Sequence, residues 1–194
     1  ITVRHLLTHT SGVFDYEDLI FADAITQVKD KDVLELLSRQ EKTYFSPGAK
    51  FRYSNSGYAL LALIVEKTSG QPFAGFLRSN IFEPLGMTNT VAFEPGVSTV
   101  PSRALGYTRD KNGYTLSDQS PTSAVLGDGG VYSSVADLFK WDQAFYTEKL
   151  VSRGMLKRAF TAASQVSDVP GNGYGFGWYV GQHHGKEYVW HYGS

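Results

Sequence analysis

The sequence predicts a mixed α/β fold of the α+β type, rich in helices and with few strands. The strongest helix signal runs from Ser56 to Ser69, and its stretch from Tyr58 to Val65 is apolar nearly all round, as in a buried helix. Strand signals gather late in the chain, at Tyr174 to Val180 and at Glu187 to Tyr192, with a hairpin loop from Gly181 to Lys186 between them. No internal repeat or low-complexity segment changes this prediction.

Capping residues place most of the other helices, because a Ser, Thr or Asp oxygen accepts hydrogen bonds from free N–H groups at a helix start. Thr2 is expected to cap a helix over Val3 to Thr8, and Asp30 or Asp32 a helix through Arg39. A helix through Asn80 is expected to have Pro72 in its first turn. Ser134 and Asp137 predict a capping box for a helix to about Tyr146, and Ser152 is expected to cap a helix to about Phe160. Leu138, Trp141 and Phe145 are expected to face inward.

Turn signals divide the rest of the chain. Gly70 is the expected C-cap of the long helix, and Pro84-Leu85-Gly86 is expected to break the helix that follows. Lys111-Asn112-Gly113 predicts a hairpin between strands at Ala104 to Thr108 and Tyr114 to Leu116, since Asn-Gly favours tight hairpin turns.

Composition excludes several classes of function. Hydrophobic residues make up 42% and charged residues 19%, which indicates a globular chain, and 194 residues suit one domain. A formal net charge of −1 without a basic patch argues against nucleic acid as a partner. The absence of cysteine excludes disulfides and thiolate catalysis. We expect no membrane-spanning segment in this chain, because its longest apolar run is far too short, and the compartment stays open.

Tyr53 and Asn55 are the first candidates for chemistry, since they stand between a Pro-Gly turn and the start of the long helix. A tyrosine beside a cation has a lowered phenol pKa and is a usable proton carrier. An Asn two residues further along an extended segment points to the same side and is able to hydrogen-bond a substrate amide or a lysine. The alternative, favoured on spacing alone, is that Tyr53 is a core-edge aromatic and Asn55 the helix cap.

His191 to Ser194 form the second candidate, at the end of a predicted strand. His191 titrates near neutral pH, Gly193 permits close approach of a substrate, and a free N–H at such an edge is able to stabilise an oxyanion. A plain strand with a glycine near its end is the alternative. A metal site at His5 and His9, spaced four residues apart, is disfavoured because no third ligand is evident, and the glycine-rich segment at 127–130 lacks the Lys of a phosphate loop.

Taken in order, these motifs resemble the serine hydrolase family of class C β-lactamases and penicillin-binding proteins, which also includes D-alanyl-D-alanine carboxypeptidases and esterases. The resemblance covers essentially the whole chain. Its segments are Ile1-Thr-Val-Arg-His-Leu-Leu-Thr-His-Thr-Ser-Gly12, Phe51-Arg-Tyr-Ser-Asn-Ser-Gly-Tyr58 with the helix after it, Ile81-Phe-Glu-Pro-Leu-Gly-Met-Thr88, Gly129-Gly-Val-Tyr-Ser-Ser134 and His191-Tyr-Gly-Ser194. It implies a β-lactamase/transpeptidase-like fold, of which this chain holds the helix-rich region and part of the antiparallel sheet.

The resemblance also implies roles for individual residues. Family members transfer an acyl group through the Ser of a Ser-x-x-Lys motif. Tyr53 would then be the catalytic acid/base, Asn55 would orient the Lys and the substrate, and His191 would tune Tyr53 or bind a substrate carboxylate. Gly193 would leave room for the substrate, and the N–H of Ser194 would be an oxyanion donor. No metal or cofactor is implied.

Two departures from the family pattern bear on activity. No Ser-x-x-Lys occurs in the 194 residues, and Thr26-Gln-Val-Lys29 only imitates it. We therefore expect residues 1–194 to be a truncated domain, inactive alone, with the nucleophile before Ile1 and the last strands and helix after Ser194. Tyr192 is bulkier than the usual Thr or Ser, which puts carboxylate recognition in doubt.

The expected function of the parent protein is acyl-enzyme hydrolysis of a β-lactam, a D-alanyl peptide or a small ester. The His at position 191, in place of Lys, shifts this expectation towards peptidase or esterase. The alternative is a non-catalytic ligand-binding or interaction module derived from the same fold. A dimer through exposed sheet edges is compatible with the sequence, and the resemblance is compatible with a periplasmic or other extracytoplasmic parent.

Overall fold

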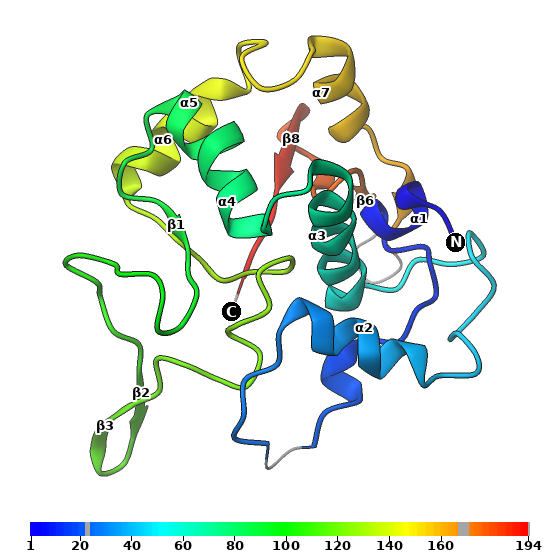
Figure 1. Ribbon diagram of the computed structural model, residues 1–194. Coiled ribbons are helices and arrows are strands. Elements are labelled where there is room, and N and C mark those ends of the chain that lie inside the picture. The colour runs from blue at the N-terminus through cyan, green and yellow to red at the C-terminus, as the bar shows by residue number, and fades with distance from the viewer. Residues whose placement is uncertain (22–23, 167–170, 194) are drawn as a thin grey trace.

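The computed structural model describes residues 1–21, 24–166 and 171–193. Helix α3 (Asn55–Ser69) lies at the centre of the molecule and packs against α1 (Val3–Leu7), α2 (Asp30–Ser38) and α4 (Phe73–Leu77) (Figure 1). Its fully buried residues are small ones, Ser56, Gly57, Ala59 and Ala62, whereas its larger apolar side chains stay partly exposed. Small side chains let neighbouring backbones come close to this helix. The long helix predicted at Ser56 to Ser69 is confirmed.

The start of α3 is held by a distant turn. Ser54 is its N-cap residue but makes no side-chain capping bond. The carboxylate of Asp15 accepts the Asn55 N–H at 2.8 Å instead, and the Tyr16 N–H donates to the Ser56 hydroxyl at 2.8 Å. A negative charge at a helix N-terminus is favourable, so the short 3₁₀ helix η1 (Tyr16–Asp18) is locked onto the first turn of α3.

Two predicted helix boundaries differ from the structure. Helix α2 begins at Asp30 with Lys29 as its N-cap residue, and Asp32 reaches back to accept the Lys29 N–H. After α4, the helical path continues through a π-helical turn, η2 (Arg78–Phe82), into α5 (Glu83–Leu85). Pro84 therefore does not break the helical path, which ends at left-handed Gly86.

The main sheet has four antiparallel strands in the order β5 (Ser164–Gln165), β6 (Gly173–Tyr174), β7 (Tyr179–His183) and β8 (Lys186–Trp190). The single strand predicted for Tyr174 to Val180 is wrong, because the Phe176 N–H leaves the ladder to bond Ala159 at 2.9 Å. The hairpin loop between β7 and β8 is shorter than predicted, since His183 pairs with Lys186. A second, two-stranded sheet pairs β1 (Val91–Ala92) with β4 (Val131–Tyr132).

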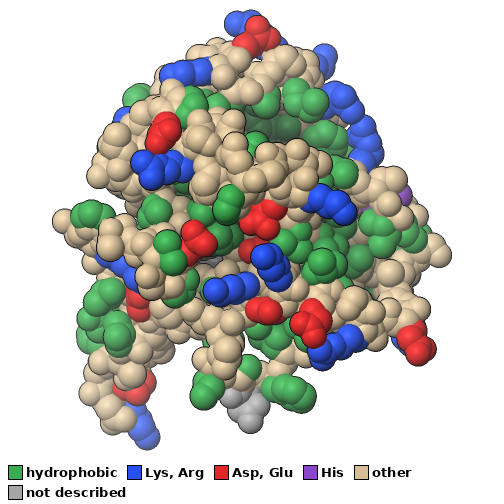
Figure 2. Space-filling view, viewed as in Figure 1, with side chains coloured by type: hydrophobic (Ala, Val, Ile, Leu, Met, Phe, Trp, Pro, Cys, Tyr) green, Lys and Arg blue, Asp and Glu red, His purple; other side chains and the backbone are tan. Residues whose placement is uncertain are grey.

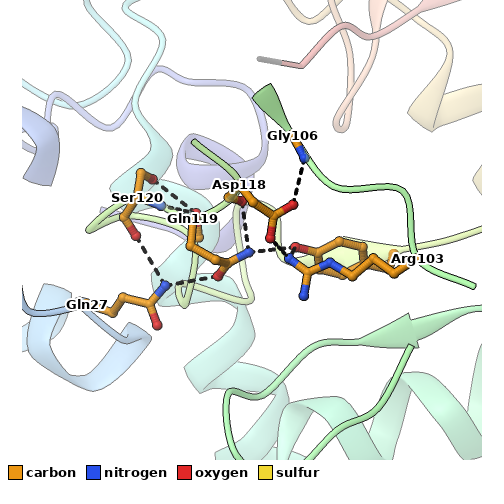
Figure 3. Close-up of polar contacts among 8 residues, drawn as sticks. Gln27, Arg103, Gly106, Asp118, Gln119 and Ser120 are labelled. Atoms are coloured by element: carbon orange, nitrogen blue, oxygen red, sulfur yellow. Dashed lines mark hydrogen bonds and ion pairs between the residues drawn. The ribbon is translucent and has the colours of Figure 1, made fainter. Parts of the chain in front are cut away.

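The predicted hairpin forms an arm that extends away from the helices, with strands β2 (Tyr107–Asp110) and β3 (Gly113–Leu116) (Figure 1). Hydrophobic side chains cover part of this arm in Figure 2, in keeping with exposed Tyr107, Tyr114 and Leu116. A polar network holds its base: Arg103 pairs with Asp118 and donates to the Tyr132 hydroxyl at 2.8 Å, and Asp118 accepts the Gly106 N–H (Figure 3).

Helix α6 (Val135–Ala144) starts at Ser134 as predicted, and α7 (Arg153–Ala159) starts at Ser152. The side chain of Asp137 is buried but does not complete a capping box. It accepts hydrogen bonds from the Asn89 N–H at 2.7 Å, the Thr90 hydroxyl and Lys140. Leu138 was expected to face inward, yet it is 54% exposed.

Trp141 and Phe145 of the same region do contact each other, edge to face, with ring centroids 5.1 Å apart. Phe145 in turn contacts Phe160 and Trp178. An aromatic cluster thus joins the end of α6 to α7 and to the loop between β6 and β7. Within the described ranges, no helix is long and apolar enough to cross a membrane.

Candidate active site

Tyr53 lies just before α3, where helix and sheet meet. Its ring is half-buried against the cluster of Val166, Tyr174 and Tyr179, and it packs on the His9 ring with centroids 4.1 Å apart. The His191 ring lies 6.1 Å away. The structure therefore brings Tyr53 and His191 together from positions far apart in the sequence.

The hydroxyl of Tyr53 makes no hydrogen bond to any residue within the described ranges, which leaves it free for a ligand. Burial raises its pKa to about 12, and the nearby carboxylates of Asp128, Asp15 and Glu17 act in the same direction. Tyr53 is consequently protonated at neutral pH. A cation close to the phenol would lower this pKa, because it favours the phenolate.

Asn55 is the first residue of α3, so it is neither in an extended segment nor the cap of the helix. Its backbone N–H is bound by Asp15, and its side-chain Nδ2 donates to Glu17 at 3.0 Å. The alternative expectation, that Asn55 caps the helix, is therefore wrong. The contact with Glu17 fixes the Asn55 amide with its Oδ1 unpaired among the described residues.

Strand β8 ends at Trp190, two residues earlier than predicted, so His191 lies just after the strand. Its Nε2 lies 3.1 Å from the Tyr174 hydroxyl, and its Nδ1 lies 2.8 Å from the Tyr192 carbonyl oxygen. Burial of the ring lowers its pKa, although the bond to Tyr192 opposes this. At neutral pH the neutral form dominates, which does not favour the expected role of a cation beside Tyr53.

The carboxylates of Asp128, Asp15 and Glu17 lie near Tyr53. Asp128 accepts the buried Tyr16 hydroxyl at 2.8 Å, and burial raises the pKa of Asp128 to about 7. Burial also raises the pKa of Asp15 and of Asp30. Asp30 binds the backbone N–H groups of Leu126 and Gly127, so it holds the loop that carries Asp128. The surroundings of Tyr53 are thus electronegative and would attract a cation.

A cavity of about 930 Å³ opens beside this site. Its walls are mostly aromatic and include two cationic residues; the lining residues are Tyr44, Phe45, Lys50, Phe51, Arg52, Tyr53, Val166, Tyr179, Trp190 and Tyr192. Gly193 is exposed, and a side chain added there would meet nothing within 4 Å. The expected oxyanion donor, Ser194, lies outside the described residues.

The two histidines considered as metal ligands do not converge. The Thr2 N–H donates to His5 near the start of α1, whereas His9 is buried and bonded through both ring nitrogens. Among the described residues, no group of three His, Cys, Asp or Glu side chains is arranged to hold a metal ion.

His9, Asp128 and Tyr174 are site residues that sequence reasoning missed. His9 was considered only as a metal ligand and as part of a family segment, and Asp128 only as part of a glycine-rich turn. Tyr174 enters the sequence prediction only as the start of a strand. Asp128 and Tyr174 each lie in a glycine-rich stretch, whereas His9 lies between two threonines, and neither pattern is informative until contacts are known.

Comparison with known proteins identifies the relationship. The sequence model of the family described as Beta-lactamase matches residues 1–194, the whole chain. The chain belongs to the Beta-lactamase family. This confirms the resemblance carried by the motifs around Tyr53 and His191.

Individual relatives agree with this assignment. The chain is 35% identical over 192 residues to a penicillin-binding protein of Bacillus subtilis, covering 92% of this chain and 42% of that protein. It is 27% identical to a D-aminopeptidase of Brucella anthropi, covering 100% of this chain and 37% of that protein. An octameric penicillin-binding protein homologue from Pyrococcus abyssi superposes with a TM-score of 0.83 at 29% identity, over 97% of this chain and 45% of that one. The chain thus spans less than half the length of these relatives, and its α+β fold class is confirmed.

Proposed function

We propose that this β-lactamase-family chain carries the Tyr53, Asn55 and His191 side of an active site that hydrolyses a small amide or ester through an acyl-enzyme. The observation that supports it best is the Tyr53 phenol: its ring packs on His9, it lines an open cavity, and its hydroxyl has no hydrogen-bond partner among the described residues. The kinship with penicillin-binding proteins and a D-aminopeptidase favours D-alanyl peptides or similar amides over other substrates.

The nucleophile and its lysine belong to a Ser-x-x-Lys motif outside residues 1–194 in this proposal. The motif is absent from the chain, and the chain covers only 42% of its B. subtilis relative. The electronegative surroundings of Tyr53 suit such a lysine. Its ammonium would offset the carboxylates and bring down a phenol pKa of about 12, which is too high for a proton carrier at neutral pH.

The remaining residues then have separate tasks. Asn55, held by Glu17, orients the substrate amide and the lysine. His191 is a neutral hydrogen-bonding group at the edge of the site. The space beside Gly193 admits the acyl group, and the N–H of Ser194 donates to the oxyanion. Lys50 and Arg52 line the cavity, and because Arg52 is paired with Asp18, Lys50 is the cation that would meet an anionic substrate end.

Intact-mass measurement after incubation with a reactive penicillin, and separately with an activated ester, tests this proposal. The chain of 194 residues is expected to stay unmodified, and a version extended upstream through the Ser-x-x-Lys is expected to gain one adduct. An adduct on residues 1–194 would contradict the location of the nucleophile. No adduct on either version would favour the non-catalytic binding module.

A matched pair of variants of the extended protein addresses Tyr53. Tyr53→Phe is expected to slow acylation by roughly 10²–10⁴-fold, the usual contribution of a positioned acid/base. Tyr44→Phe removes another hydroxyl from the same cavity, one already bonded to Asp18, and is expected to leave the rate within a factor of about two. Equal rates for the two variants would exclude Tyr53 as the proton carrier.

A dimer through the sheet edge remains part of the proposal. In the described sheet β8 is an outer strand, and an unpaired strand edge is able to extend a sheet into a second copy. Sedimentation equilibrium of residues 1–194 measures this directly. A single monomeric species at high concentration would exclude the dimer.

A further inference from the structure

A continuous line of hydrogen bonds joins the buried core to His191. The Ser54 N–H lies 3.1 Å from Nδ1 of His9, and Nε2 of His9 lies 3.2 Å from the Tyr174 hydroxyl. That hydroxyl lies 3.1 Å from Nε2 of His191, whose Nδ1 lies 2.8 Å from the Tyr192 carbonyl oxygen. His9 is 2% exposed and Tyr174 0%, so water does not compete for the inner bonds.

The two ends of this line determine where every proton lies. The Ser54 N–H can only donate, so Nδ1 of His9 must accept with its lone pair. In the neutral ring the hydrogen is therefore on Nε2. His9 stays neutral because burial lowers its pKa to about 3. A carbonyl only accepts, so Nδ1 of His191 carries a hydrogen. In between, Tyr174 accepts from His9 and donates its own hydrogen to Nε2 of neutral His191.

A second acceptor near Tyr174 allows the hydrogen bond between Tyr174 and His191 to reverse its direction. The Tyr58 hydroxyl lies close enough to the Tyr174 hydroxyl to influence its pKa, and Tyr58 donates its own hydrogen to the Leu7 carbonyl oxygen at 2.9 Å. When His191 takes up a proton, its new Nε2–H donates to Tyr174, which still has a free lone pair. The Tyr174 hydrogen then rotates towards Tyr58. No proton leaves either tyrosine, and every donor keeps an acceptor.

We propose that His9 and Tyr174 are positioning residues that hold the His191 ring in one orientation and let it gain or lose a proton without losing its hydrogen bond. The effect of this positioning on catalysis rests on the proposed role of His191 in the active site. The positioning itself does not depend on activity.

The groups that face His191 are consistent with this assignment. They are Tyr53, Tyr174, Tyr179 and Tyr192, with ring centroids 5.6–6.1 Å away, and His9 behind Tyr174. Tyrosines are neutral over the range in which a histidine titrates. The hydrogen bonds, rather than a neighbouring carboxylate, therefore set the tautomer of His191.

Nitrogen NMR of the chain labelled with ¹⁵N-histidine tests the proposal in the unsubstituted protein. Neutral His9 is expected as a single tautomer with hydrogen on Nε2, and neutral His191 as a single tautomer with hydrogen on Nδ1. His9→Gln and His191→Gln spectra assign the signals by loss. The opposite tautomer for either histidine, or a mixture for His191, would overturn the proposal.

Variants then separate Tyr174 and Tyr58 from general packing. Tyr174→Phe is expected to move the His191 Nε2 resonance downfield, towards that of a free lone pair. Tyr58→Phe removes the second acceptor and is expected to disfavour protonated His191 about fivefold, the effect of one neutral hydrogen bond. Tyr179→Phe is the matched control, because its hydroxyl bonds only Tyr192 among the described residues.

The Tyr179→Phe control distinguishes a specific effect of Tyr174 or Tyr58 from a general effect on packing. Tyr179→Phe is expected to leave both the His191 tautomer and its titration unchanged. An equal response to Tyr58→Phe and Tyr179→Phe would contradict the rotation of the Tyr174 hydroxyl. The tautomers of the unsubstituted chain decide the proposal even where a variant fails to fold. Acylation data on the extended protein test the proposed function separately.

Discussion

Replacement of Asp128 by Asn should stabilise the chain at alkaline pH. The side chain of Asp128 is half-buried, accepts the Tyr16 hydroxyl and faces Asp30, Glu17 and Asp15. Its pKa rises from a usual 3.8 to about 7, mainly because burial disfavours the charged form. The folded chain thus holds a proton that the unfolded chain has released, and the contribution of this group to stability falls as pH rises from about 4 to about 7.

The size of the effect follows from the two pKa values. A shift from 3.8 to about 7 corresponds to about 4 kcal/mol once the carboxyl is ionised in both states. Solvent screening of a partly exposed group reduces this, so about 2–4 kcal/mol is expected at pH 8. The Asn amide oxygen still accepts the Tyr16 hydroxyl, and little difference is expected at pH 4.

His9 contributes a pH dependence of the opposite sign. Its pKa falls from 6.5 to about 3 on folding, so stability is lost as pH falls through this range. This gain with rising pH opposes the loss from Asp128. Asp128→Asn removes that loss, so the stability of the variant relative to the unsubstituted chain should rise between about pH 4 and pH 7.

Urea unfolding at pH 4, 6 and 8 measures these differences. Asp142→Asn, an exposed carboxylate on α6, is the matched control and is expected to change the unfolding free energy by less than about 0.5 kcal/mol at each pH. Parallel pH curves for Asp128→Asn and the unsubstituted chain, or a less stable Asp128→Asn at pH 8, would refute the reasoning.

Two further predictions use the same urea assay. Gly127→Ala is expected to cost roughly 2–3 kcal/mol, because its Cβ would lie 2.4 Å from the Tyr58 carbonyl oxygen, whereas Gly129→Ala meets nothing within 4 Å and should change little. Equal effects of the two would contradict this close approach. Asp137→Ala is expected to cost about 2–4 kcal/mol through the loss of three hydrogen bonds to a buried carboxylate, and Asp137→Asn less, since one oxygen still accepts. A loss for Asp137→Ala no larger than for the exposed Asp142→Asn would show that these bonds contribute little.

Predictions that depend on nearby residues agreed with the structure. Thr2, Ser134 and Ser152 cap their helices as expected, since an N-cap bonds backbone groups only two or three residues away. Gly70 ends α3 in the left-handed conformation for the same local reason. The hairpin likewise follows from its turn, although its first strand is Tyr107–Asp110 rather than the predicted Ala104 to Thr108.

Predictions failed where a distant partner competes. Asp137 leaves its capping role for Asn89 and Thr90, because a buried carboxylate takes the strongest donors available. The expected strand through Tyr174 is interrupted because Ala159 captures the Phe176 N–H. Asp15, rather than a residue of the helix itself, binds the Asn55 N–H at the start of α3.

The sequence by itself determined the family, the order of the helices and the choice of Tyr53, Asn55 and His191, because motifs, caps and hydrophobic periods are written along the chain. Only the tertiary structure decided that Tyr53 is protonated among carboxylates and that His191 is neutral and bonded through Tyr174 to His9. Protonation depends on burial and on groups that lie within a few ångströms in space. Residues 9, 53, 128, 174 and 191 become neighbours only when the chain folds.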